Sequence, residues 1–279
     1  MNKIGVLISL HADTDIAAEM KKVRDMDCDC CQITVWNTAL YTDEMAQAIV
    51  AAANAYGVEV STLWAGWSGP KEWNFVGGPD TLGIVPAAYR MKRTEEILMG
   101  VDFAVKLGVS RVATHVGFLP ENVNDPAYHG VLAALRYIVK YCRKKGVSFL
   151  FETGQETPVT LLRVIEELGG DGVGINMDTA NLILYGKANS ADAITVFGKY
   201  VLDTHIKDGL YPTGGRSLGK EVKVGEGMAN LPEVIKRLRA VGYTGNYVIE
   251  REISGEEQIR DIADTVTYLK ALLKEEVSC

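Results

Sequence analysis

Short apolar runs rich in β-branched and aromatic residues alternate with segments of helical periodicity along the whole chain. Eight such runs predict strands, and each is followed by enough chain for a helix. The expected strands cover residues 3–9, 31–36, 58–64, 111–116, 148–152, 172–177, 201–206 and 246–251. Strands that alternate with helices favour parallel pairing through crossover helices. The pattern therefore predicts an α/β chain, with residues 1–279 forming one domain, a single (β/α)8 TIM barrel.

The segments between the strands have the apolar spacing of amphipathic helices. One stripe comprises Val131, Leu132, Leu135, Ile138, Val139 and Cys142, and another comprises Leu231, Val234, Ile235 and Leu238. Such stripes should pack on the outer wall of the barrel. Thr157 before Pro158, and Asn230 three residues before Glu233, mark expected helix starts.

Two connections are unusually long for a compact domain, residues 65–86 and residues 208–228. Connections of this length are commonly functional. Both follow the carboxyl end of an expected strand, which is the active face of a TIM barrel. We therefore expect both to lie over the active site.

Composition and charge narrow the possible partners. The chain is 47% apolar and 23% charged, which is ordinary for a soluble globular protein. Its net charge of -7 would repel a phosphate backbone, so we expect a small-molecule partner and no nucleic acid. Because the sequence has neither an apolar run long enough for a membrane span nor a signal peptide, we expect no membrane partner. The five cysteines lack a zinc-site spacing, which favours reduced thiols and a cytoplasmic location.

Four potential metal ligands lie at or near the ends of the last four expected strands. Glu152, Asp178 and Glu250 each end an apolar run, and His205 lies late in another. Burying a carboxylate is costly without a partner. Neighbouring strands lie about 4.8 Å apart, so four inward side chains on successive strands can converge on one point. The sequence therefore places one nitrogen donor and three carboxylates at the mouth of the barrel.

Three carboxylates would repel one another at that point unless a cation lay among them. This donor set suits one divalent ion such as manganese, cobalt, magnesium or zinc. The alternative is that each is an ordinary strand-end residue satisfied by a helix N-terminus or a lysine.

The segments around these residues resemble the metal-site segments of the xylose isomerase-like superfamily. They are Phe151-Glu152-Thr153-Gly154, Asn176-Met177-Asp178-Thr179-Ala180-Asn181, Thr204-His205-Ile206-Lys207-Asp208 and Ile249-Glu250-Arg251-Glu252. The resemblance runs in order from about residue 104 to residue 272, in a superfamily that includes ketose 3-epimerases, inosose-processing enzymes and endonuclease IV. It implies that Glu152 and Glu250 bind the metal and also exchange the substrate proton from opposite faces. Related barrels often form dimers or tetramers, so the resemblance is compatible with a homo-oligomer.

Five further residues are candidates for substrate contact. His115 lies at the end of the fourth expected strand and resembles a histidine that sugar enzymes of the group use near substrate; a buried, hydrogen-bonded histidine is the alternative. Trp64 and Trp67 bracket the end of the third strand, and their faces suit the C–H faces of sugars, although core packing explains them equally well. Lys207 could neutralise an enediolate oxygen or form a salt bridge. Glu226, between two glycines, resembles a turn residue of the family and could touch substrate.

The resemblance implies a metal-dependent isomerase or epimerase that acts on a ketose or related keto-sugar through an enediolate. A lyase of the dehydratase or deglycosylating type remains an alternative, because the same enediolate can expel a leaving group. Endonuclease IV-like DNA repair is a weaker alternative, since that enzyme uses three metals and many histidines and this chain has four histidines. A noncatalytic carbohydrate-binding barrel would need the sugar pocket but no metal.

Overall fold

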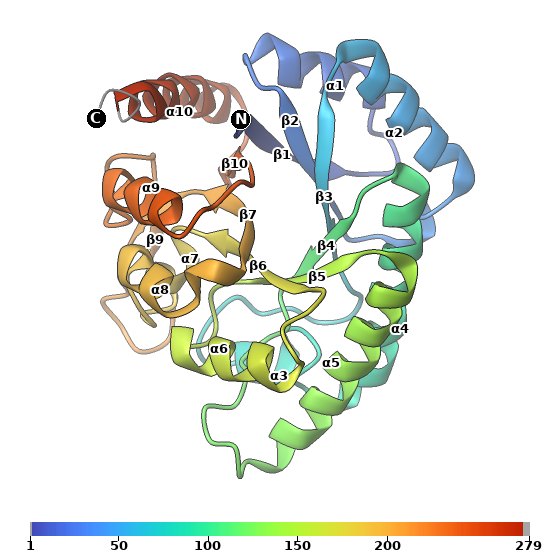
Figure 1. Cartoon of the computed structure of the whole chain (residues 1–279), viewed down its shortest axis with the longest axis vertical. Helices are drawn as coiled ribbons and strands as arrows, with labels where there is room; N and C mark the ends of the chain where they lie inside the picture. The colour runs from blue at the N-terminus through green and yellow to red at the C-terminus, as the bar shows by residue number, and fades with distance from the viewer. Residues whose placement is uncertain (1, 276–279) are drawn as a thin grey trace.

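The computed structural model describes residues 2–275 as one closed barrel of parallel strands surrounded by helices (Figure 1). The strands follow the order β1-β10-β7-β6-β5-β4-β3-β2 around the barrel. Their bounds are β1 (Ile4–Leu10), β2 (Cys30–Val35), β3 (Glu59–Ala65), β4 (Arg111–Thr114), β5 (Ser148–Glu152), β6 (Val173–Asp178), β7 (Val201–Ile206) and β10 (Tyr247–Ile249). The predicted fold class, a single (β/α)8 TIM barrel, is confirmed.

All eight predicted strands are present, but three end earlier than the sequence suggested. β2 ends at Val35, β4 ends at Thr114 and β10 ends at Ile249. His115 and Glu250 therefore lie on the first residues of the following loops, where backbone direction is set by the loop and not by the strand pleat.

The helices pack around the barrel, as their apolar stripes predict (Figure 1). Their bounds are α1 (Ile16–Asp25), α2 (Asp43–Tyr56), α3 (Gly78–Thr81), α4 (Ala87–Leu107), α5 (Pro126–Lys145), α6 (Pro158–Glu167), α7 (Asn181–Leu184), α8 (Ser190–Phe197), α9 (Leu231–Ala240) and α10 (Glu256–Glu275). Thr157 caps α6 as expected, because its side chain accepts a hydrogen bond from the Thr160 amide. Asn230 precedes α9 with a positive φ of 51° and makes no side-chain cap bond.

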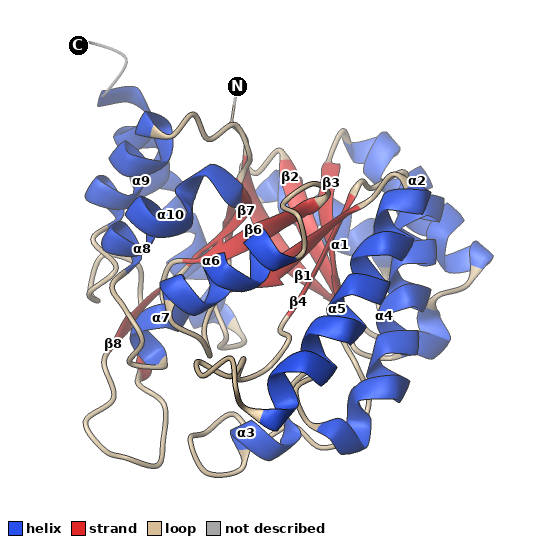
Figure 2. Ribbon diagram, turned by 60° about the horizontal axis from the view of Figure 1, so that its bottom comes forward, coloured by secondary structure: helices blue, strands red, loops and turns tan. Residues whose placement is uncertain are grey.

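The two long connections project from the same side of the barrel and meet there (Figure 2). The second contains an antiparallel hairpin that the sequence did not suggest, β8 (Asp208–Leu210) with β9 (Lys220–Val222). Asn74 of the first connection forms a β-bridge with Ser217 of the second, and the Phe75 amide donates to the Arg216 carbonyl at 3.0 Å. The two connections thus form a strap over the barrel mouth.

A continuous apolar core joins the barrel strands to the helices around them, and Cys28, Cys31 and Cys142 belong to it. Cys28, Cys30, Cys31 and Cys142 are free thiols in the described part of the chain, and all four are buried. Burial raises the pKa of each of them, which keeps them as small apolar side chains. Within residues 2–275, no helix combines the length and apolar character that a membrane crossing requires.

Candidate metal centre and sugar pocket

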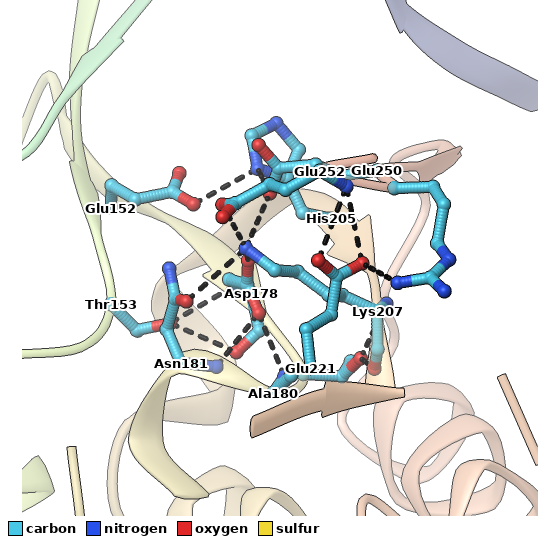
Figure 3. A network of polar contacts seen from close by, with 12 residues as sticks. Glu152, Thr153, Asp178, Ala180, Asn181, His205, Lys207, Glu221, Glu250 and Glu252 are labelled. Carbon is cyan, nitrogen blue, oxygen red and sulfur yellow. Dashed lines mark hydrogen bonds and ion pairs between the residues drawn. The ribbon is translucent and has the colours of Figure 1, made fainter. Parts of the chain in front are cut away.

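The four predicted ligands lie together at the carboxyl end of the barrel. Glu152 ends β5, Asp178 ends β6, His205 is the penultimate residue of β7, and Glu250 directly follows β10. One potential ligand atom from each lies within 4.8 Å of the others. Figure 3 shows these side chains converging from the four adjacent elements. The convergence expected from strand spacing is therefore present.

The individual contacts leave metal-facing atoms available. The Nδ1 atom of His205 lies 2.9 Å from Glu152 Oε1 and 3.2 Å from Glu250 Oε2. Asp178 Oδ1 accepts hydrogen bonds from the amides of Ala180 and Asn181 at the start of α7. Its other oxygen, Oδ2, is buried and makes no hydrogen bond, and its nearby cation is the Lys207 ammonium at 3.4 Å. A buried carboxylate oxygen of this kind is costly unless a cation satisfies it.

Without a metal ion, bound protons offset the negative charge of the carboxylates in the cluster. Burial raises the pKa of Asp178 well above its usual value. Although burial opposes the charged form of His205, Glu152 and Glu250 raise its pKa well above 6.5. Burial also opposes the charged form of Glu250, but Lys207 and His205 hold its pKa well below the usual range. A divalent cation would displace protons from such a cluster, so the donor set fits one.

A chain of buried hydrogen bonds across the barrel sets the orientation of His205. Asn176 Nδ2 donates to Glu152 Oε2, so the Asn176 oxygen accepts from Gln32 Nε2 at 2.9 Å. The Gln32 oxygen then faces His205 Nε2 at 2.9 Å and can only accept. His205 must therefore carry a proton on Nε2, which leaves Nδ1 to face the carboxylates of Glu152 and Glu250 as the nitrogen that could bind a metal.

Lys207 lies inside the ion cluster and is fully buried. Its ammonium is 3.4 Å from Asp178 Oδ2 and 3.2 Å from Glu250 Oε2, and it also donates to Glu252 and Asn181 (Figure 3). Lys207 therefore offsets the negative charge of the carboxylates. It is not among the residues that line the adjacent cavity.

A cavity of about 310 Å³ opens above the cluster, at the small end of the range for ligand pockets. One side carries the carboxylates, and the other carries aromatic rings from β3 and from the loops after β2, β3 and β4. Its lining residues are Leu7, Ser9, Thr34, Trp36, Trp64, Trp73, His115, Glu152, Asn181, Leu184, Tyr185, Leu218, Glu250 and Glu252.

The five predicted substrate contacts divide between the cavity and its surroundings. His115 and Trp64 line it, and the Nδ1 atom of His115 is buried without a hydrogen-bond partner. Burial lowers the pKa of His115, so its imidazole is suited to exchange hydrogen bonds with a neutral hydroxyl. Trp67 is fully buried, and its Nε1 donates to the His115 carbonyl at 3.2 Å. Glu226 is exposed in its turn and does not line the cavity.

Several residues of the site were not found from the sequence. Gln32 and Asn176 are polar residues inside otherwise apolar strands, and that break in the pattern was the available signal. Trp36 directly follows the last residue of β2, at a strand end like the metal ligands. Trp73 and Tyr185 lie in irregular segments or at a helix end, where no periodicity marks their position.

Comparisons with known proteins agree with this architecture. A family model described as a xylose isomerase-like TIM barrel matches residues 20–272. The chain is similar to a xylose isomerase domain protein from Planctomyces limnophilus, with 31% identity, 99% of each chain covered and a TM-score of 0.91. It shares its fold with an L-ribulose 3-epimerase, with 17% identity, coverage of 100% and 99%, and a TM-score of 0.74. An uncharacterized protein of Methanocaldococcus jannaschii is 22% identical over 98% of this chain and 89% of its own length.

Proposed function

The chain belongs to the xylose isomerase-like TIM barrel family, and from that premise we propose that it is a divalent-metal-dependent isomerase or epimerase of a ketose or related keto-sugar. The observation that carries the proposal is the buried set of Glu152, Asp178, His205 and Glu250 beside a cavity with an aromatic wall. Several solved structures of similar fold are those of sugar epimerases, among them a D-tagatose 3-epimerase-like protein.

The ligand set would hold one divalent cation. When bound, this ion supplies Lewis acidity that makes the hydrogen next to the substrate carbonyl easier to remove. Glu152 and Glu250 reach the site from opposite sides of His205, since β7 lies between β10 and the β6–β5 pair in the barrel. Their carboxylates can therefore approach a sugar from two directions.

Either carboxylate can remove the proton and return it. Return by the opposite carboxylate to the same carbon gives an epimer, and return to the neighbouring carbon gives an isomer. The free Nδ1 atom of His115 can accept a hydrogen bond from a sugar hydroxyl on the facing wall. The acidic lining also opposes a nucleic-acid backbone, and no contact in the site favours a lyase over proton return.

The experiment combines metal content with solvent exchange. A panel of ketoses is incubated with the Mg²⁺- or Mn²⁺-loaded protein in heavy water, and products are examined for deuterium beside the carbonyl. Glu152→Gln and Glu250→Gln should each lower turnover by about 10² to 10⁴-fold while metal analysis shows the ion retained. Glu59→Gln, at the opposite end of the barrel, is the matched control and should behave as wild type. Full activity after chelation, or normal turnover in both site variants, would refute the proposal.

A further inference from the structure

All four tryptophans of the chain form one cluster beside the candidate metal centre. We call Trp36, Trp64, Trp67 and Trp73 the tryptophan wall. The ring centroids of Trp36 lie 5.0 Å from Trp64, 5.4 Å from Trp67 and 6.3 Å from Trp73. Three of the four rings line the cavity, and Trp67 supports them from the buried side. The wall is therefore a continuous aromatic surface opposite the carboxylates.

The wall extends from the depth of the cavity to its entrance. Trp64 is 5% exposed, whereas Trp73 is 40% exposed although it lines the same cavity. Trp73 is not on a free loop, because the next residue, Asn74, bridges to Ser217 on the opposite connection. A large aromatic side chain held exposed at the rim of a cavity indicates a surface that a ligand covers.

The charged side chains that line the cavity disfavour a phosphorylated sugar. Among the residues of the described chain that line it, the charged side chains are Glu152, Glu250 and Glu252, and none is lysine or arginine. Lys207 is enclosed by carboxylates, and Lys223 is paired with Asp264 at 2.5 Å. Outside the lining, the exposed Lys71 places its ammonium 4.7 Å from the centroid of the Trp36 ring. A phosphate group beside the candidate metal centre would meet the three glutamates and would find no guanidinium, and the amides at the start of α7 already donate to Asp178.

We propose that the substrate is an uncharged ketose that carries a second ring. The reacting sugar lies between Glu152 and Glu250, and the second ring stacks on Trp36 and Trp73 at the entrance. The first part of this statement rests on the proposed function, whereas the second rests on the tryptophan wall alone. A single unsubstituted sugar would leave the outer part of the wall uncovered.

Intrinsic tryptophan fluorescence reads this surface directly, because every tryptophan of the chain lies in the wall. The Mg²⁺-loaded protein is titrated with D-fructose, D-fructose 6-phosphate and isomaltulose, which is fructose with a glucosyl ring on O6. In the open-chain keto form, these three ligands differ only in what O6 carries. Isomaltulose should bind about tenfold more tightly than fructose, and fructose 6-phosphate should bind most weakly.

Variants of Trp73 test whether the preference for isomaltulose over fructose arises at the entrance of the cavity. Trp73→Ala should reduce the preference for isomaltulose to about twofold or less, and Trp73→Phe should retain most of it because an aromatic face remains. Tyr137→Ala removes another exposed aromatic side chain, on α5 away from the cavity, and should change nothing. Circular dichroism of each variant checks that the barrel is folded.

Three results would overturn the inference: fructose 6-phosphate binding as tightly as isomaltulose, isomaltulose binding no better than fructose, or an unchanged preference in Trp73→Ala. The two proposals can fail separately. If isomaltulose binds at the wall but no ketose exchanges deuterium, the proposed function fails and the ring subsite stands. If fructose is turned over but isomaltulose shows no binding, the proposed function stands and the ring subsite fails.

Discussion

Replacement of Gln32 by leucine tests whether the hydrogen-bond chain behind His205 prepares the metal site. Gln32 accepts from His205 Nε2 and donates to Asn176, both at 2.9 Å, and it is fully buried. Without metal, the raised pKa of His205 keeps a proton on both ring nitrogens. With Gln32→Leu, Nε2 loses its acceptor, so the ring gives up that proton and keeps the one on Nδ1, where Glu152 accepts it at 2.9 Å. That tautomer blocks the nitrogen that should bind the metal.

The loss of metal affinity in Gln32→Leu follows from the free energy needed to move this proton. To free Nδ1, the proton must move to Nε2, where the leucine side chain offers no acceptor. A buried donor left without a partner costs about 1–3 kcal/mol. Loss of a residue that orients a metal ligand typically weakens metal affinity about 10- to 100-fold, or roughly 1.4–2.7 kcal/mol, which is the same range. We therefore expect Gln32→Leu to raise the Kd for Mg²⁺ or Mn²⁺ by about 10- to 100-fold.

Isothermal titration of the ion into chelator-treated protein measures this Kd, and the metal-induced rise in Tm gives a second readout. Gln32→Glu keeps an acceptor for His205 and should bind metal within a few-fold of wild type. Thr62→Val is the matched control, because it also removes a buried hydrogen bond inside the barrel, from Thr62 to Asp203. It should lower stability without changing metal affinity. A wild-type Kd in Gln32→Leu, or equally weak binding in Gln32→Glu, would refute the reasoning.

Two further predictions concern stability. Burial raises the pKa of Glu156 from its ordinary 4.5 to about 8, so between these values the folded chain holds a proton that the unfolded chain has lost. The free energy of unfolding should therefore fall as pH rises through this window, by about 1.4 kcal/mol per pH unit from this group. Urea unfolding at several pH values should show a weaker pH dependence of stability for Glu156→Gln. The same pH dependence in the variant and the wild type would contradict the assignment. Gly83 has a φ of +65°, and an added Cβ would lie 2.0 Å from the carbonyl carbon of Val116. Gly108 has a similar φ of +71° but open space around it, so Gly108→Ala should cost only about 1–2 kcal/mol. Gly83→Ala should destabilise the protein considerably more. Equal Tm values for the two variants would count against this reasoning.

The strand pattern and the positions of the candidate metal ligands were predictable from the sequence, because both are local features. A buried strand has to be an apolar run of limited length, and a carboxylate or imidazole at its end is visible in a few consecutive residues. Glu152, Asp178 and His205 follow this rule. Glu250 follows it too, although β10 ends one residue before it. The β8–β9 hairpin was missed because each of its strands has three residues and one contains Gly209.

Only the tertiary structure decided which distant side chains share the site. Gln32 and Asn176 are 144 residues apart in sequence, and their contact depends on which strands face each other inside the closed barrel. Trp73 reaches the cavity because its loop is fastened to Ser217 on the other long connection. Neither relation leaves a periodic signal, since each depends on barrel closure and on the path of irregular loops. The sequence by itself therefore determined the fold and the four candidate metal ligands, whereas three-dimensional packing determined what orients His205 and which side chains line the cavity.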